Sequence, residues 1–185
     1  MHFFICGTHT CGKTSIIKKL HEEAVITFGG DEIGKRLYYQ RKTRTEQFNA
    51  DFEAEVSQLE LIRDRHVASS ELGDVVALET WHPGNLAYAM SRNPDAMKTI
   101  IDVFEMSPLR HDIIGIWLRL ENPKKTIAER TKTFSNDRDW ASNFYSKMQD
   151  LISESLHKMD MFNRTIIISA DGSFDAVYHD VHRTI

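Results

Sequence analysis

Eight residues near the N-terminus have the types and spacing of a loop that binds phosphate groups. Residues 7–14, GTHTCGKT, satisfy the pattern G-x-x-x-x-G-K-[ST]. Glycines let such a loop curl tightly enough for successive backbone N–H groups to point at phosphate oxygens. Lys13 would reach the β- and γ-phosphates, and the hydroxyl of Thr14 would hold Mg²⁺. The spacing therefore predicts ATP and Mg²⁺ as ligands of Gly7, Thr8, His9, Thr10, Cys11, Gly12, Lys13, Thr14 and Ser15.

A second candidate for chemistry is a carboxylate at the end of an apolar run. The run spans residues 75–80 and ends on Glu79 and Thr80. In an open parallel sheet, ligands bind at the carboxyl ends of the strands, beside a phosphate-binding loop. We therefore interpret Glu79 as a group that shares Mg²⁺ with Thr14. A carboxylate that only caps the next helix is the alternative.

Five short apolar runs must supply the framework that positions these residues: 3–6, 24–28, 75–80, 113–120 and 165–170. They are continuous rather than alternating, which is typical of parallel strands buried on both faces. Helical periodicity between them, at 14–23, 48–72 and 142–161, indicates crossover helices. The apolar face of the second helix is expected to hold Phe52, Val56, Leu59, Ile62 and His66. This alternation predicts an α/β three-layer fold, and the length fits one domain, 1–185.

The overall composition argues against several classes of protein. A net charge of −4 and a pI near 6.1 do not favour binding to a nucleic acid polymer. Cys6 and Cys11 cannot build a disulfide framework, so a reducing, cytoplasmic compartment is expected. The sequence has neither a signal-peptide core nor a run of about 18 apolar residues, so no membrane partner is expected.

Further short motifs follow one another in a fixed order. They read GGDEIGKR at 29–36, LELIRDRH at 59–66, ETWHPGNLAY at 79–88, AER at 128–130 and DRD at 137–139. In this order they resemble segments of the thymidylate kinase-like, or deoxynucleoside (monophosphate) kinase, branch of the P-loop nucleotide kinases. The similar segments in that family are G-G-x-x-I-G-x-x-I-R, L-L-F-x-A-D-R, D-R-Y-x-x-S-S-L-A-Y and a lid with A-x-x-R…D-R-x-E.

The resemblance implies a P-loop kinase fold with a five-stranded parallel sheet of order 2-3-1-4-5. It also implies an acceptor-binding region at about 29–70 and a lid at about 130–140. The implied activity is phosphoryl transfer from ATP, with Mg²⁺, to a nucleoside monophosphate. By position, Lys13 and Glu79 would be catalytic, and Arg130 and Arg138 would be lid cations that grip the transferring phosphoryl group.

The same resemblance assigns binding roles to further residues. The loop 169–172, with Ala170 and Asp171, would lie beside adenine. The acceptor would be contacted by Arg65 and Tyr88. Because the acceptor needs a cation for its phosphate and an aromatic platform for its base, Arg36 and Trp81 are added as candidates.

Departures from the family pattern leave the acceptor open. Thr80 and Gly29 stand where the family has arginines that hold the acceptor phosphate, and Leu61 replaces a base-stacking phenylalanine. We expect a small-molecule acceptor, first of all a (deoxy)nucleoside monophosphate other than dTMP. A nucleoside or another small molecule is the alternative, followed by a P-loop NTPase or switch without kinase activity. The GTPase motif N-K-x-D does not occur. A homodimer is left open.

Overall fold

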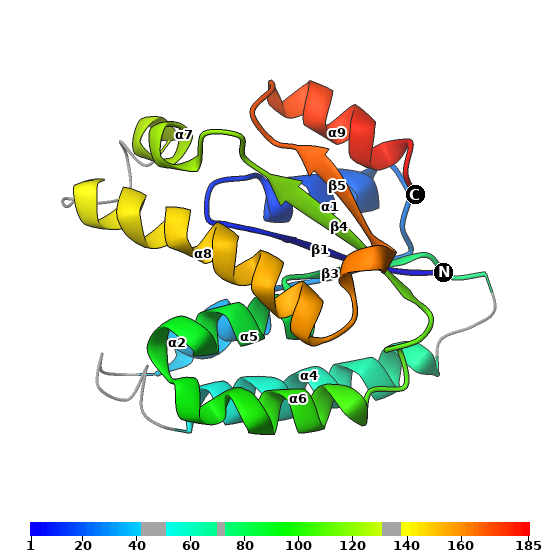
Figure 1. Cartoon of the computed structure of the whole chain (residues 1–185). Coiled ribbons are helices and arrows are strands. Elements are labelled where there is room, and N and C mark those ends of the chain that lie inside the picture. The colour runs from blue at the N-terminus through cyan, green and yellow to red at the C-terminus, as the bar shows by residue number, and fades with distance from the viewer. Residues whose placement is uncertain (42–50, 70–72, 131–137) are drawn as a thin grey trace.

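A computed structural model of the chain describes residues 1–41, 51–69, 73–130 and 138–185, without the side chain of Arg138. Its strands are β1 (His2–Gly7), β2 (Phe28–Gly30), β3 (Val76–Glu79), β4 (Ile113–Arg119) and β5 (Thr165–Ser169). They pair in parallel in the order β2-β3-β1-β4-β5 (Figure 1). The α/β class and the strand order 2-3-1-4-5 are therefore confirmed.

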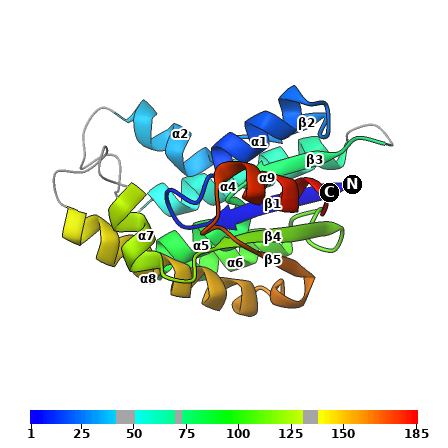
Figure 2. The ribbon, with the colours of Figure 1, turned by 90° about the horizontal axis from the view of Figure 1, so that it is seen from above.

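Helices cover both faces of the sheet (Figure 1). On one face lie α1 (Lys13–Glu22) and α9 (Phe174–His182). The other face carries α4 (Phe52–Ala68), α5 (Trp81–Arg92), α6 (Met97–Glu105) and α8 (Arg138–Lys158). At the end of the sheet to which the strands point, Figure 2 shows α2 (Ile33–Gln40) and α7 (Pro123–Arg130). The 3-10 helices η1 (Pro94–Ala96) and η3 (Phe162–Arg164) precede α6 and β5.

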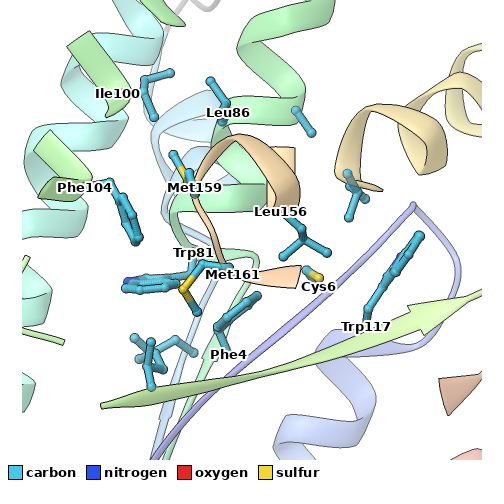
Figure 3. Close-up of a cluster of buried hydrophobic side chains, with 14 of the residues drawn as sticks. Phe4, Cys6, Trp81, Leu86, Ile100, Phe104, Trp117, Leu156, Met159 and Met161 are labelled. Atoms are coloured by element: carbon cyan, nitrogen blue, oxygen red, sulfur yellow. The ribbon is translucent and has the colours of Figure 1, made fainter. Parts of the chain in front are cut away.

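The central strand explains why the apolar runs are continuous. Phe4 and Cys6 point into a cluster that α5, α6 and α8 complete (Figure 3). Phe3 and Ile5 point into the opposite cluster, beneath α1 and α9. Because both faces of the sheet are covered, the successive residues 3–6 of β1 are all buried, at 1% exposure or less.

Four of the five predicted strands agree with the structure to within one residue at each end, and the run 24–28 does not. The second strand is Phe28–Gly30, whereas residues 24–27 form the turn that leaves α1. Ala24 adopts a positive φ of 55°, which ends the helix and excludes an extended strand at that point. The apolar residues here anchor the turn instead, with Ile26 buried in the core.

The long helix predicted at 48–72 is described as α4, and residues 48–50 and 70–72 lie outside the described part. Its buried face differs from the apolar stripe that periodicity indicated. Ile62 is 61% exposed and His66 is exposed. The buried face instead carries four polar residues, Glu53, Ser57, Glu60 and Asp64. Buried acids of this kind need partners. Glu53 accepts a hydrogen bond from Arg92 Nε at 2.9 Å, and the partners of Glu60 and Asp64 are described below.

A proline followed by a glycine commonly marks a turn, but Pro83 and Gly84 belong to a helix. Both residues lie inside the first turns of α5. Proline is tolerated there because its missing N–H would have no partner within the helix. Within the described ranges, no helix combines the length and the apolarity that crossing a membrane requires.

Candidate active site

The loop between β1 and α1 contains two glycines in conformations that other residues rarely adopt. Gly7 and Gly12 have φ angles of 152° and 97°. A Cβ on Gly7 would lie 2.7 Å from both the Cys11 sulfur and the Leu118 carbonyl oxygen. Glycine at position 7 is therefore required by space as well as by conformation.

Lys13 lies across this loop. Its Nζ donates hydrogen bonds to the carbonyl oxygens of Gly7 (3.0 Å) and Thr8 (3.2 Å), and the residue is 7% exposed. Burial works against its charge, but nearby acidic groups, Glu32 and Glu79 among them, outweigh burial and raise the pKa of the ammonium group. Lys13 is therefore a cation held inside the curve of the loop.

Glu79 and the hydroxyl of Thr14 meet at the end of β3. Thr14 Oγ1 donates to Glu79 Oε1 at 2.8 Å, with Oε2 at 3.0 Å. The register brings them together, because Glu79 pairs beside Ile5 on β1 and α1 follows β1. Burial raises the pKa of the Glu79 carboxyl, although Lys13 opposes the shift. Oxygen ligands suit Mg²⁺, which takes its other ligands from phosphates and water, so this pair fits the predicted metal.

The residue after Glu79 has a strained backbone. Thr80 has φ 72° and ψ −61°, the geometry of a rare γ-turn, and its β-branched side chain makes this conformation unfavourable. Trp81 also has a positive φ, of 54°. The Thr80 amide donates to the Ile5 carbonyl at 2.9 Å. Strain of this kind persists only where surrounding contacts hold it.

Those contacts come from a buried polar cluster on α4. Asp64 is fully buried and accepts hydrogen bonds from Trp81 Nε1 (2.8 Å), His82 Nε2 (2.9 Å) and Ser107 Oγ (2.6 Å). Burial alone would raise the pKa of Asp64, but the hydrogen bonds from these three residues outweigh it and lower the pKa. The cluster fixes the start of α5 and with it the turn that carries Glu79.

This position of Trp81 corrects its predicted role. Its indole ring is 0% exposed and packs against Phe4 and Phe104, with ring centroids 5.1 and 5.7 Å away (Figure 3). A ring enclosed in the core offers no face to an acceptor base. Trp81 is therefore a structural residue rather than an acceptor platform.

A hollow of about 320 Å³ lies on the other side of the phosphate loop. Arg130 closes one end, because its guanidinium donates to the Thr10 carbonyl (3.2 Å) and to the Ala170 carbonyl (2.8 Å). The residues that line the hollow come from the phosphate loop, α1, α7 and the segment after β5. They are Thr10, Cys11, Gly12, Ile16, Arg130, Ala170, Gly172, Phe174 and Val177. The position and size suit a nucleotide base next to the phosphates.

The other residues expected on this side have separate places. Asp171 accepts hydrogen bonds from the Glu121 amide (2.6 Å) and from Thr126 Oγ1 (3.1 Å), so its carboxylate holds the loop in place. Ser15 is exposed in the first turn of α1. Residues 131–137 of the predicted lid and the side chain of Arg138 lie outside the described part, so the role of Arg138 stays a prediction.

Glu32 is a half-buried acid that was not among the predicted site residues, and its charge acts on groups of the phosphate loop. It precedes α2 as the N-cap residue. Its charge acts to raise the pKa of five groups that come from four different segments, although burial leaves the pKa of His9 lowered overall. They are Lys13, His9, Glu79, Tyr88 and Tyr145. Charges exert such influence over about 10 Å, so Glu32 lies among these side chains.

Two tyrosines border the same region. Tyr88 on α5 is partly buried, and burial raises the pKa of its hydroxyl. Tyr145 on α8 stacks on His9, with ring centroids 4.8 Å apart. The backbone carbonyl of Tyr145 accepts a hydrogen bond from Thr8 Oγ1 at 2.8 Å. The structure therefore brings Tyr88 to this side, as its candidate role requires, and adds Tyr145.

The two arginines that were candidates for the acceptor are both exposed. Arg36 lies on α2 and Arg65 on α4. Arg63, not Arg65, reaches the turn before α2, where Nη1 donates to the Asp31 carbonyl at 2.6 Å. Because residues two apart on a helix point in nearly opposite directions, Arg65 cannot share this position. A role for Arg65 at the acceptor is therefore not supported.

Glu32 and Tyr145 are thus the site residues that sequence reasoning missed. Glu32 could have been found by the signal that identified Glu79, namely an acidic residue at the carboxyl end of a strand. It was overlooked because the second strand was placed at 24–28 instead of Phe28–Gly30. Tyr145 lies next to the apolar Phe144 in a helical pattern, and nothing in the sequence distinguished it.

Comparison with known proteins shows relatives in structure only. No family model and no curated protein sequence matches the chain. Deoxyadenosine kinase from M. mycoides, solved with the product dCMP and a flexible dCDP, superposes with a TM-score of 0.63 at 14% identity, over 100% of this chain and 97% of that chain. NadR in complex with NR gives 0.71 at 12% identity, over 98% of this chain and 47% of that chain.

Shikimate kinase from Aquifex aeolicus is also similar, with a TM-score of 0.53 at 14% identity, over 100% of this chain and 95% of that chain. The superpositions establish the fold, but identities of 12–14% are too low to assign an activity, which is argued from the site. The chain therefore has the fold of the P-loop kinases.

Proposed function

We propose that this chain is a kinase that transfers the γ-phosphoryl group of ATP to a hydroxyl group of an uncharged, nucleoside-like acceptor. The observation that carries the proposal is the position of Glu32. The electrostatic influence of this second carboxylate on both Lys13 and Glu79 supports a position near the reacting groups, where an acceptor would enter.

The donor half supports phosphoryl transfer. Lys13 provides a fixed positive charge inside the loop, and Arg130 lies between the loop and the base hollow. Thr14 and Glu79 would hold Mg²⁺, which neutralises charge on the transferring group when it is bound. Catalysis of this kind depends almost entirely on position and electrostatics, and Lys13 and Glu79 are both buried, charged groups held in place.

Glu32 would act on the acceptor. As the acceptor oxygen bonds to the γ-phosphorus, the bond from that phosphorus to the bridging oxygen breaks and ADP leaves. The hydroxyl proton needs a base, and the Glu32 carboxylate would receive it. A positioned base contributes about 10²–10⁴-fold to the rate of such a step.

Charge argues that the acceptor is neutral. A monophosphate would approach two carboxylates, Glu32 and Glu79, and like charges close together are unfavourable. Thr80, which replaces a family arginine, is buried and uncharged. The name of the deoxyadenosine kinase neighbour also supports a nucleoside acceptor.

A nucleoside monophosphate is the second candidate, because one cation lies close enough to receive its phosphate. Lys35, on the first turn of α2, lowers the pKa of both His9 and Glu79 through its charge. It would take the place of the missing arginines. The two candidates therefore differ in whether Lys35 or Glu32 dominates the acceptor site.

Release of ADP from ATP tests the proposal, measured with no acceptor and with matched pairs of nucleosides and nucleoside monophosphates, dTMP and thymidine included. We expect acceptor-dependent release that is faster with a nucleoside than with its monophosphate. Glu32→Gln should lower the acceptor-dependent kcat by ~10²–10⁴-fold. Glu22→Gln, an exposed acid on α1, is the matched control and should leave the rate unchanged.

Three results would decide otherwise. Faster turnover of the monophosphates would select the second candidate. Hydrolysis that no acceptor stimulates would select an NTPase instead of a kinase. Normal turnover by Glu32→Gln would remove Glu32 from the mechanism.

A further inference from the structure

A partly buried arginine joins the turn that carries Glu32 to the helices behind it. Arg63 on α4 is 11% exposed in its side chain. Its Nη1 donates to the Asp31 carbonyl at 2.6 Å, and its Nη2 forms an ion pair with the fully buried Glu60. The guanidinium therefore binds a backbone atom of the turn and a fixed carboxylate at the same time.

Glu60 is itself held from the next helix. Its Oε1 accepts a hydrogen bond from Asn85 Nδ2 of α5 at 3.0 Å. Burial raises the pKa of Glu60, while Arg63 opposes that shift. Ion pairs removed from water add little to stability compared with apolar packing. The role of the Arg63–Glu60 ion pair is therefore to hold other groups in position more than to stabilise the fold.

The bound carbonyl is the one that matters for Glu32. The Asp31 carbonyl and the Glu32 amide belong to the same planar peptide unit, so holding one fixes the plane from which Glu32 projects. Gly30 makes room for the contact, because a Cβ there would lie 3.1 Å from Arg63 Nη1 and 2.7 Å from Leu78 Cδ2. The Glu32 side chain itself makes no capping hydrogen bond to α2, so it is not turned back onto its helix.

We propose that Arg63 is a positioning residue that aims Glu32 at the acceptor, through the Asn85–Glu60–Arg63 chain of contacts. The proposal rests on the function proposed above, in which Glu32 receives the hydroxyl proton. Arg63 touches neither ATP nor the acceptor and acts only by fixing the turn. Loss of this contact displaces Glu32, and a misplacement of about 1 Å can cost ~10²-fold in rate.

A double-mutant cycle on kcat tests this, using Arg63→Gln, Glu32→Gln and the double variant with the best acceptor. Arg63→Gln should lower the acceptor-dependent kcat by ~10²-fold and leave the KM for ATP unchanged. In the Glu32→Gln background, the same change should alter kcat by less than about twofold, because the group it positions has lost its function. Arg183→Gln is the matched control. It breaks an exposed i,i+3 arginine–aspartate pair at the C-terminal end of α9 and should change neither value.

A second measurement is independent of turnover. Hydrogen exchange of residues 29–34 should be faster in Arg63→Gln, while exchange in the phosphate loop stays the same. If Arg63→Gln does not fold, Arg63→Lys replaces it in the cycle, since lysine retains the charge but not the two-armed geometry.

Additive effects of the two substitutions would overturn the proposal, and so would unchanged exchange at 29–34. If the wild-type protein transfers a phosphoryl group to none of the acceptors, the proposed function fails and the positioning role fails with it. If the wild type is active and the effects are additive, only the positioning role fails.

Discussion

Replacing Glu79 by glutamine should lower activity and raise stability. The carboxyl is 3% exposed, and burial raises its pKa even though Lys13 opposes the shift. A raised pKa means that the folded chain binds a proton more readily than the unfolded chain does. The ionised carboxylate therefore reduces the free energy of unfolding at neutral pH. Glutamine retains the shape and an oxygen that accepts from Thr14, but it has no charge to bury.

The two effects have different sizes and different pH dependences. Loss of one preorganised group that stabilises the transition state lowers kcat by ~10²–10³-fold. Relief of a single unfavourable feature raises the free energy of unfolding by about 0.5–2 kcal/mol. In a chain of this length, 1 kcal/mol corresponds to about 2–4 °C in Tm. The gain should be largest at neutral and alkaline pH and should vanish below the ordinary carboxyl pKa of 4.5, where both states are protonated.

The assay is thermal unfolding of the wild type and Glu79→Gln between pH 4 and pH 8, without Mg²⁺ or nucleotide, together with kcat at pH 7. Glu22→Gln serves as the control, because an exposed acid should not produce the same pH-dependent gain. A glutamine variant that melts below the wild type at pH 8 would refute the argument. A Tm difference that is the same at pH 4 and pH 8 would also refute it.

Two further substitutions test the support behind Glu79. Asp64→Ala should lower the free energy of unfolding by ~3–5 kcal/mol, because it leaves buried hydrogen-bond donors without an acceptor. Urea titration measures this change, and a loss below about 1 kcal/mol would contradict the prediction. Gly84→Ala should lower it by ~1–3 kcal/mol, although alanine favours helices, since the new Cβ would lie 2.4 Å from Thr80 Cγ2. Thr80→Ser removes that methyl group and should restore the stability of the Gly84→Ala chain; failure to do so would show that the clash is not the cause.

The phosphate loop and the sheet could be predicted because their signals are local. The spacing of residues 7–14 constrains backbone conformation directly, and continuous apolar runs report strands that are covered on both faces. The pairing of Thr14 with Glu79 also followed, because the carboxyl ends of neighbouring parallel strands meet at one edge. In each case the sequence pattern and the tertiary contact arise from the same few residues.

The acceptor side was harder because its contacts join distant segments. Asp64 and Glu60 are not part of the apolar face that periodicity predicted, yet both are fully buried, because their partners on α5 lie at least 17 residues away in sequence. Hydrophobic periodicity cannot recognise a polar residue whose burial depends on such a partner. Trp81 was misplaced for the same reason, since its hydrogen bond to Asp64 draws it into the core.

The contacts between the phosphate loop and α8 link the two halves of the site thermodynamically. Thr8 and His9 both belong to the loop that would hold the donor, and both contact Tyr145, which borders the acceptor side. A nucleotide that shifts the loop therefore shifts one wall of the acceptor region. By reciprocity, whatever factor the donor applies to acceptor affinity, the acceptor applies to donor affinity. In the proposed function, one hydroxyl and one stacked ring pair would thus make the binding of either substrate sensitive to the other.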